Sequence, residues 1–174
     1  MAQTVFRYYG ISPWEIEVLY GYFRSRFDVV QDEIEPDDVE FVSKLSLYIP
    51  VAFSEEFFIW FDYRRWEKVK SLFKEIKRRR GSGNALKVNL IFSGEPTITF
   101  TMDSEDKQWF DNSVEKIDFV LELLPYHLDK DKIPPNTATI SYRFDSKTVR
   151  WRLYRAIADT EYLFRGDGWA PIEE

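Results

Sequence analysis

Residues 62–81 read DYRRWEKVKSLFKEIKRRRG, and this stretch decides the fold class. Asp62 is a preferred N-cap residue, and Gly81 stands where a helix commonly ends in the left-handed αL conformation. The apolar residues between them recur at spacings of three and four: Trp66, Val69, Phe73 and Ile76. Because this stripe is narrow, we predict one amphipathic helix that packs against a sheet.

Segments with strand patterns surround this helix. The sequence contains three pairs of extended segments, and turn residues separate the two segments of each pair. The pairs are 28–35 with 39–48, 86–92 with 97–102, and 137–144 with 148–156. Each pair predicts a hairpin, because Pro, Gly, Asp and Ser favour tight turns. We also expect short strands at 4–9 and at 57–61 (FFIWF), the latter being too short and too uniformly apolar to favour a helix.

Two further helices are expected from the sequence. Ser12, Pro13 and Glu15 form a capping box that begins a helix reaching about residue 27, with Trp14 among its apolar positions and Glu15 on its polar side. Residues 112–124 fit both a helical and a strand period. We favour the helix there, with Asn112 and Glu115 as its capping box.

These elements predict an α+β fold in a single domain, 1–174. Its core would be a mainly antiparallel sheet built from three hairpins, with two or three helices packed on it. Helices begin near 12, 62 and 112 and each precedes a hairpin, which is also compatible with βαββ-type repeats whose boundaries fall near 52 and 105. The tail after residue 167 is expected to fray.

The composition excludes several classes of function. The chain has no cysteine, which removes disulfides, thiolate nucleophiles and cysteine zinc sites. No stretch has the length and apolarity of a signal peptide or a membrane span, so we assign the chain to the cytoplasm. Aromatic residues make up 18% of the chain. We expect them to form the core, with an aromatic-lined pocket or partner surface as the alternative.

No motif for catalysis, a metal or a cofactor stands out. His127 is the only histidine, and a capping or surface role at a helix end explains it. The acidic clusters lie in turns, where solvation accounts for them, and Gly81-Ser82-Gly83 lacks the Lys-Ser or Lys-Thr of a phosphate-binding loop. The sequence therefore favours a non-catalytic protein without cofactor or metal.

The distribution of charge is the strongest functional signal. Residues 62–87 carry ten basic and three acidic groups, a net charge of +7, within a chain whose net charge is −6. The simplest explanation is that this positive charge is compensated within the molecule, by the helix dipole and by the acidic segment 28–40. The alternative is that an acidic partner compensates this charge.

We therefore expect a soluble interaction protein, an assembly or regulatory factor, that binds an acidic protein through the basic helix and exposed aromatics. Binding of nucleic acid is the first alternative, since bases and aromatics interleave on the strand from 150 to 155, although a pI of about 5.0 opposes it. Binding of a small molecule in an aromatic cavity is the second. The candidate partner-binding residues are Arg64, Lys68, Lys74, Arg78, Arg79, Arg80, Arg150, Arg152 and Arg155.

Overall fold

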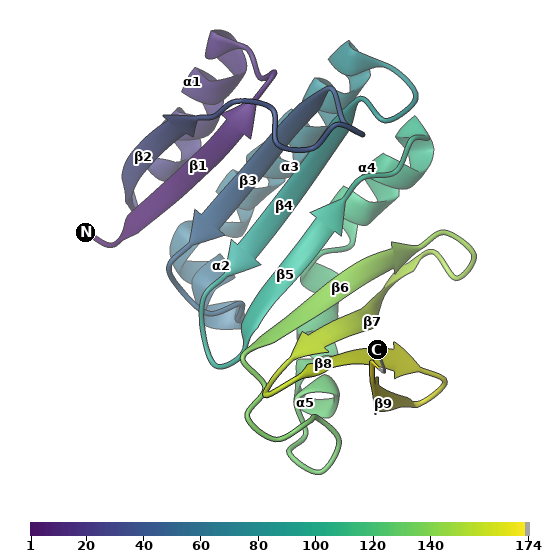
Figure 1. Ribbon diagram of the computed structural model, residues 1–174. Coiled ribbons are helices and arrows are strands. Elements are labelled where there is room, and N and C mark those ends of the chain that lie inside the picture. Colours follow the sequence, from purple (N-terminus) through teal and green to yellow (C-terminus); the bar gives the residue numbers. More distant parts are fainter. Residues whose placement is uncertain (173–174) are drawn as a thin grey trace.

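Nine strands within residues 1–172, the part of the chain that the computed structural model describes, join into one sheet in the order β2-β1-β3-β4-β5-β6-β7-β8-β9 (Figure 1). The strands are β1 Gln3–Tyr9, β2 Asp28–Glu33, β3 Ser43–Ile49, β4 Leu86–Phe92, β5 Thr97–Met102, β6 Thr139–Asp145, β7 Arg150–Ile157, β8 Glu161–Arg165 and β9 Gly168–Pro171. The helices are α1 Pro13–Phe23, α2 Glu55–Phe61, α3 Tyr63–Arg80, α4 Lys107–Glu115, the 3₁₀ helix η1 Asp118–Glu122 and α5 Leu124–His127.

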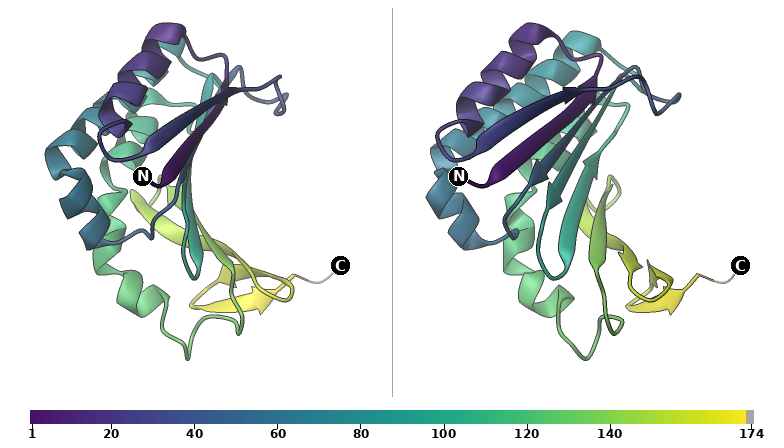
Figure 2. Two further views of the ribbon diagram at one scale, coloured as in Figure 1. Left: turned by 90° about the vertical axis from the view of Figure 1, so that its left-hand side faces the viewer. Right: turned by 60° about the vertical axis from the view of Figure 1, so that its left-hand side comes forward.

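Three crossover connections place all of these helices on one face of the sheet. α1 joins β1 to β2, α2 and α3 join β3 to β4, and α4, η1 and α5 join β5 to β6, and each of these strand pairs is parallel. The other neighbouring pairs are antiparallel, so the predicted α+β class with a mostly antiparallel sheet is confirmed. Figure 2 shows the helices on one side of the sheet and its other side uncovered, with β8 and β9 turning toward the uncovered side.

The first predicted hairpin is wrong. β2 and β3 are not partners, because β1 lies between them: Val5 is opposite Val30 of β2 on one side and opposite Tyr48 of β3 on the other. The crossover through α1 puts β2 at the sheet edge, and residues 34–42 carry the chain back past β1. The repeating unit is consequently βαβ rather than βαββ. The hairpins β4–β5 and β6–β7 form as predicted.

The prediction for α3 is confirmed in detail. The side chain of Asp62 accepts a hydrogen bond from the backbone N–H of Arg64 at 2.9 Å, and Gly81 ends the helix with a φ of 89°, although its ψ of −162° lies outside the αL region. The four residues of the apolar stripe are at most 1% exposed: Trp66, Val69, Phe73 and Ile76. The stripe therefore faces the sheet.

Three local predictions are wrong. Residues 57–61 belong to helix α2, because Ser54 caps its first turn and Phe57, Phe58 and Phe61 are buried at helical spacing. The helix favoured for residues 112–124 is confirmed, but its predicted start is wrong: it begins at Lys107 with Asp106 as its cap, instead of a box of Asn112 and Glu115, and continues as η1 and α5. In the tail expected to fray, Gly168–Pro171 form strand β9, which pairs with β8, and the last two residues lie outside the described part of the chain.

Aromatic rings fill the space between the sheet and the helices. Phe100 on β5 lies at the centre of this core, where its ring packs against those of Phe53, Tyr142 and Trp151 at centroid distances of 5.0 to 5.2 Å. Phe100 is fully buried. The high aromatic content is thus used mainly for the core. Among the described residues six aromatic side chains are exposed: Trp14, Tyr48, Trp60, Tyr63, Phe119 and Tyr126.

Candidate binding surface

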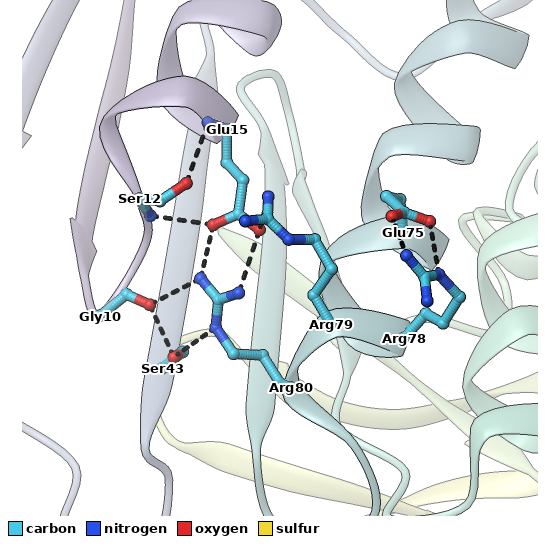
Figure 3. Close-up of polar contacts among 8 residues, drawn as sticks. All are labelled: Gly10, Ser12, Glu15, Ser43, Glu75, Arg78, Arg79 and Arg80. Atoms are coloured by element: carbon cyan, nitrogen blue, oxygen red, sulfur yellow. Dashed lines mark hydrogen bonds and ion pairs between the residues drawn. The ribbon is translucent and has the colours of Figure 1, made fainter.

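The basic end of α3 is bound to the protein's own carboxylates. Arg80 donates to both carboxylate oxygens of Glu15, from Nη2 to Oε1 at 2.5 Å and from Nη1 to Oε2 at 3.0 Å, and Arg79 adds a contact at 3.2 Å. Figure 3 shows both arginines pointing toward Glu15 while Arg78 turns to Glu75, with which it makes two hydrogen bonds of 2.6 and 2.8 Å. All three arginine side chains therefore pair with carboxylates of the same chain.

Glu15 lies at the centre of this arrangement and is fully buried. The sequence placed it on the solvent side of α1, and instead Trp14 is the exposed residue, at 56%. Burial alone would raise the pKa of Glu15, but hydrogen bonds from Arg80 and from the backbone of Ser12 outweigh it and lower that pKa. Glu15 therefore stays ionised and connects α1 to the end of α3.

The rest of the basic helix is compensated only in part. Within residues 1–172, Arg65 and Lys77 donate to the backbone carbonyls of Phe61 and Gly83 and form no ion pair. Lys74 forms an ion pair with Glu115 of α4 at 3.2 Å. Arg64 has only Asp62 at 4.0 Å and a side chain that is 94% exposed, and Lys68 is exposed without an ion pair among residues 1–172. The acids that compensate the helix come from α1, α4, η1 and α3 itself with its cap. The expectation that segment 28–40 would compensate it is therefore wrong.

The uncovered face of the sheet carries polar side chains on every central strand. Residues that alternate with the core positions of β3, β4 and β5 form a hydrogen-bonded row across this face, from Thr101 to Asn89 at 2.8 Å and from Asn89 to Ser46 at 3.2 Å. Basic side chains lie close to this row: Lys44 and Lys87 precede Ser46 and Asn89 by two positions, and Arg143 lies opposite Thr101. This face is polar enough to remain hydrated and open enough to receive an extended ligand.

Lys44 and Lys87 lie opposite each other across β3 and β4, and both are neutralised. Asp37 approaches Lys44 at 3.1 Å and Asp38 approaches Lys87 at 3.3 Å. These two acids come from the segment that carries the chain from β2 to β3. Like charges directly opposite one another in a sheet are unfavourable, and here the protein supplies one carboxylate for each lysine.

Arg143 and Arg152 form a second like-charged pair, across β6 and β7, and this one is poorly compensated. Asp145 lies 4.0 Å from Arg152, at the limit of an ion pair, and Arg143 has no ion pair within residues 1–172. Arg143 instead lies against an aromatic ring, with its Cζ 5.2 Å from the ring centroid of Tyr154. The pair therefore keeps an excess of positive charge on the open face.

A β-bulge in β7 explains how Tyr154 reaches this face. Leu153 pairs with Tyr142 and Arg155 pairs with Ser141, so Tyr154 is the extra residue between two ladder positions. Arg155 approaches the ring of Tyr154 at 5.5 Å and has Glu161 at 3.8 Å. The bulge thus places one aromatic ring between two guanidinium groups on the uncovered side.

Two neighbouring clefts meet at Arg143 and Tyr154. One has a volume of about 420 Å³ and the other about 490 Å³. Lys87, Asp103 and Arg155 also line the first, and Arg152 and Lys147 line the second. Desolvation raises the pKa of Asp103 above its usual range, and the positive charges of Lys87 and Arg143 oppose this only in part.

The predicted site residues therefore separate into distinct groups. Arg152 and Arg155 line the two neighbouring clefts of the open face, whereas Arg150 lines a smaller cavity beside Phe119. The helix residues do not join this surface. Arg143 and Lys87 were missed, because only the register of the sheet shows that they lie beside the strand from 150 to 155.

His127 has a structural position that differs from the predicted surface or capping role. Its Nδ1 lies 2.9 Å from the hydroxyl oxygen of Tyr142, a core residue, and burial lowers the pKa of His127. Within residues 1–172 no group of three or more His, Asp or Glu side chains is arranged to hold a metal ion. The histidine serves to anchor α5 to β6.

Comparison of the chain with protein-family models, with curated proteins and with solved structures returns no match in any of the three. None of the helices in residues 1–172 combines the length and the apolarity needed to cross a membrane. The argument for function consequently depends on the geometry and charge of the surface itself.

Proposed function

We propose that this chain is a non-catalytic interaction protein, an assembly or regulatory factor, whose open sheet face binds an acidic segment of a protein partner. Arg143, Arg152 and Arg155 supply the charge, and Tyr154 supplies an aromatic contact. The proposal retains the class of function expected from the sequence. It moves the binding surface from the basic helix, where Lys74, Arg78, Arg79 and Arg80 are paired with the protein's own carboxylates, to the strands β6 and β7.

The observation that carries this proposal is the poorly compensated pair of Arg143 and Arg152. The same sheet contains a comparable pair, Lys44 and Lys87, for which two aspartates lie at 3.1 and 3.3 Å. Arg143 and Arg152 face each other with one carboxylate at 4.0 Å. A like-charged pair of this kind costs stability, and a bound anionic group would remove that cost.

The residue types also favour a protein partner. An arginine binds a carboxylate through two parallel hydrogen bonds, which gives both strength and orientation. Tyrosine and arginine are enriched among the interface residues that contribute most to binding. A single aromatic ring surrounded by cations therefore fits an acidic peptide segment that also presents one apolar contact.

Single-stranded nucleic acid is the second candidate, and the position of Tyr154 favours it. The ring lies between two guanidinium groups beside the hydroxyl-bearing Thr101 and Ser141, which is the kind of surface on which a base can stack beside a phosphate. The net charge of −6 repels every polyanion, and because this repulsion grows with the charge of the ligand, it opposes a nucleic acid strand more than a short acidic segment. We therefore rank this candidate second.

The test uses fluorescence anisotropy with two labelled probes, poly-L-glutamate and oligouridylate, at low and at high salt. The double variant Arg143→Gln/Arg152→Gln should weaken binding of poly-L-glutamate by about tenfold, equivalent to about 1.4 kcal/mol. The matched control Arg64→Gln/Lys68→Gln removes the same charge from exposed positions of α3 and should change binding much less.

The two candidates separate in this assay. If oligouridylate binds and poly-L-glutamate does not, the ligand is nucleic acid. Equal losses in the two double variants would show that only overall charge matters, and the open face would then have no specific role. Absence of binding to either probe at low salt would contradict the proposal, since charge pairing is strongest there.

A further inference from the structure

An exposed apolar surface lies on the helical side of the molecule, around Phe119. Phe119 is 61% exposed, and Tyr63 at the start of α3 and Leu123 after η1 are 39% and 41% exposed. Two adjoining cavities share Phe119: one of about 520 Å³ that also includes Tyr63, and one of about 90 Å³ that also includes Leu123. Contiguous exposed apolar side chains of this size commonly mark a partner site.

The larger cavity is negatively charged. Glu55, Asp118 and Glu122 line it together with Tyr63, Phe119 and Leu121, and no basic residue lines it. Lys70 lies 3.2 Å from Asp118, but it also contacts two other carboxylates at 2.8 and 3.7 Å. Since this single cation is shared among three acids, the cavity keeps an excess of negative charge.

The combination of aromatic rings and carboxylates selects an organic cation. A guanidinium or ammonium group is attracted both to the faces of aromatic rings and to carboxylates. A bare metal ion fits less well, because no cluster of carboxylates in residues 1–172 has the geometry of a metal site and the volume of about 520 Å³ is far larger than one ion needs. A lysine or arginine side chain fits within such a space and leaves room for part of the peptide that carries it.

The smaller cavity is mainly apolar, so the two ends of this surface favour different chemical groups. Leu123, Val120, Val149 and Trp151 line it with apolar atoms, and its cations Lys116 and Arg150 exclude a second basic group. We propose that the groove from Tyr63 past Phe119 to Leu123 binds a partner peptide that carries one basic and one apolar side chain close together in sequence. The basic group enters the acidic cavity and the apolar group covers Leu123.

This groove is independent of the open sheet face, so it can be tested separately. The probe is a short fluorescein-labelled peptide that contains an Arg-Leu pair between glycines, measured by anisotropy. Two further probes replace its arginine by glutamate and its leucine by glycine. We expect the Arg-Leu peptide to bind most tightly, and high salt to weaken its binding.

Three variants locate the binding. Phe119→Ser should weaken binding of the Arg-Leu peptide by about five- to tenfold through loss of ring contact. Glu55→Gln/Glu122→Gln should weaken its binding by a similar factor, while the contact made by the peptide's leucine remains. Tyr48→Ser is the control, because Tyr48 is another exposed aromatic residue, at 39%, but lies on the opposite face of the sheet. Circular dichroism checks that each variant is folded.

Several outcomes would overturn the proposal. Equal binding of the arginine and glutamate peptides would remove the charge argument, and equal loss in Phe119→Ser and Tyr48→Ser would remove the location. If no peptide binds and light scattering instead shows a dimer that Phe119→Ser dissociates, the groove is an interface between copies of this chain and the proposed peptide is wrong.

Discussion

Replacing Glu15 by glutamine tests how the basic helix is held. Glu15→Gln keeps the size of the side chain but removes the charge that faces Arg79 and Arg80. Breaking a buried pair by removing one partner typically costs about 3–5 kcal/mol. The two arginine side chains are 38% and 18% exposed and can regain some water, so we expect a loss of about 2–3 kcal/mol in the free energy of unfolding.

The assay is equilibrium unfolding in urea at neutral pH. Glu75→Gln is the matched control, because the pair of Glu75 and Arg78 is exposed and should contribute much less to stability than the buried pair. A loss below about 1 kcal/mol for Glu15→Gln, or a loss equal to that of Glu75→Gln, would refute the structural role given to Glu15.

The pH dependence supplies a second readout for the same residue. The pKa of Glu15 is lowered in the folded protein, so the unfolded chain binds the proton more readily. The stabilisation is therefore complete above the unfolded pKa of about 4.3 and is lost as the pH falls through the lower folded pKa. Wild-type protein should lose more stability on acidification than Glu15→Gln, and parallel curves would contradict this assignment.

Three further predictions concern the core and the buried titratable groups. Phe100→Ala should cost about 3–5 kcal/mol in urea unfolding because its ring fills the centre of the core, and a loss below about 1 kcal/mol would show that the core can close around the gap. The lowered pKa of His127 means that the unfolded chain binds its proton more readily, so wild-type stability should fall as the pH drops below about 6.5; His127→Gln should flatten that slope, and an unchanged slope would assign it to other groups. Lys77 is fully buried, its pKa is lowered by burial, and it donates only to the carbonyl of Gly83 at 3.1 Å. Lys77→Met should therefore raise the free energy of unfolding by about 1 kcal/mol at neutral pH, with a smaller gain at alkaline pH, and a marked loss would show that the hydrogen bond outweighs desolvation.

The helix α3 could be predicted from the sequence because its signals are local. Asp62 and Gly81 bound it, and the stripe that includes Trp66 repeats with the helical period. FFIWF was predicted wrongly because five apolar residues fit both a buried strand and a short helix. The cap at Ser54 and the burial of Phe57, Phe58 and Phe61 decide between them.

The surface could not be predicted, because it depends on contacts between distant segments. Glu15 meets Arg80 across 65 positions of sequence, and nothing local to α1 indicates that the exposed-looking acid is buried. Arg143 meets Arg152 only through the register of β6 and β7, and Tyr154 reaches the open face only because of a bulge. The net charge of 62–87 was correctly counted, but charge counting does not reveal which cations already have partners.

The measurement that tests the central proposal most directly is a titration of ¹⁵N-labelled protein with poly-L-glutamate, followed by amide chemical shifts. We predict the largest shifts at Arg143, Arg152 and Tyr154, on the open face of β6 and β7. Shifts confined to Arg64, Lys68 and their neighbours in α3, with β6 and β7 unchanged, would contradict it and return the binding surface to the basic helix.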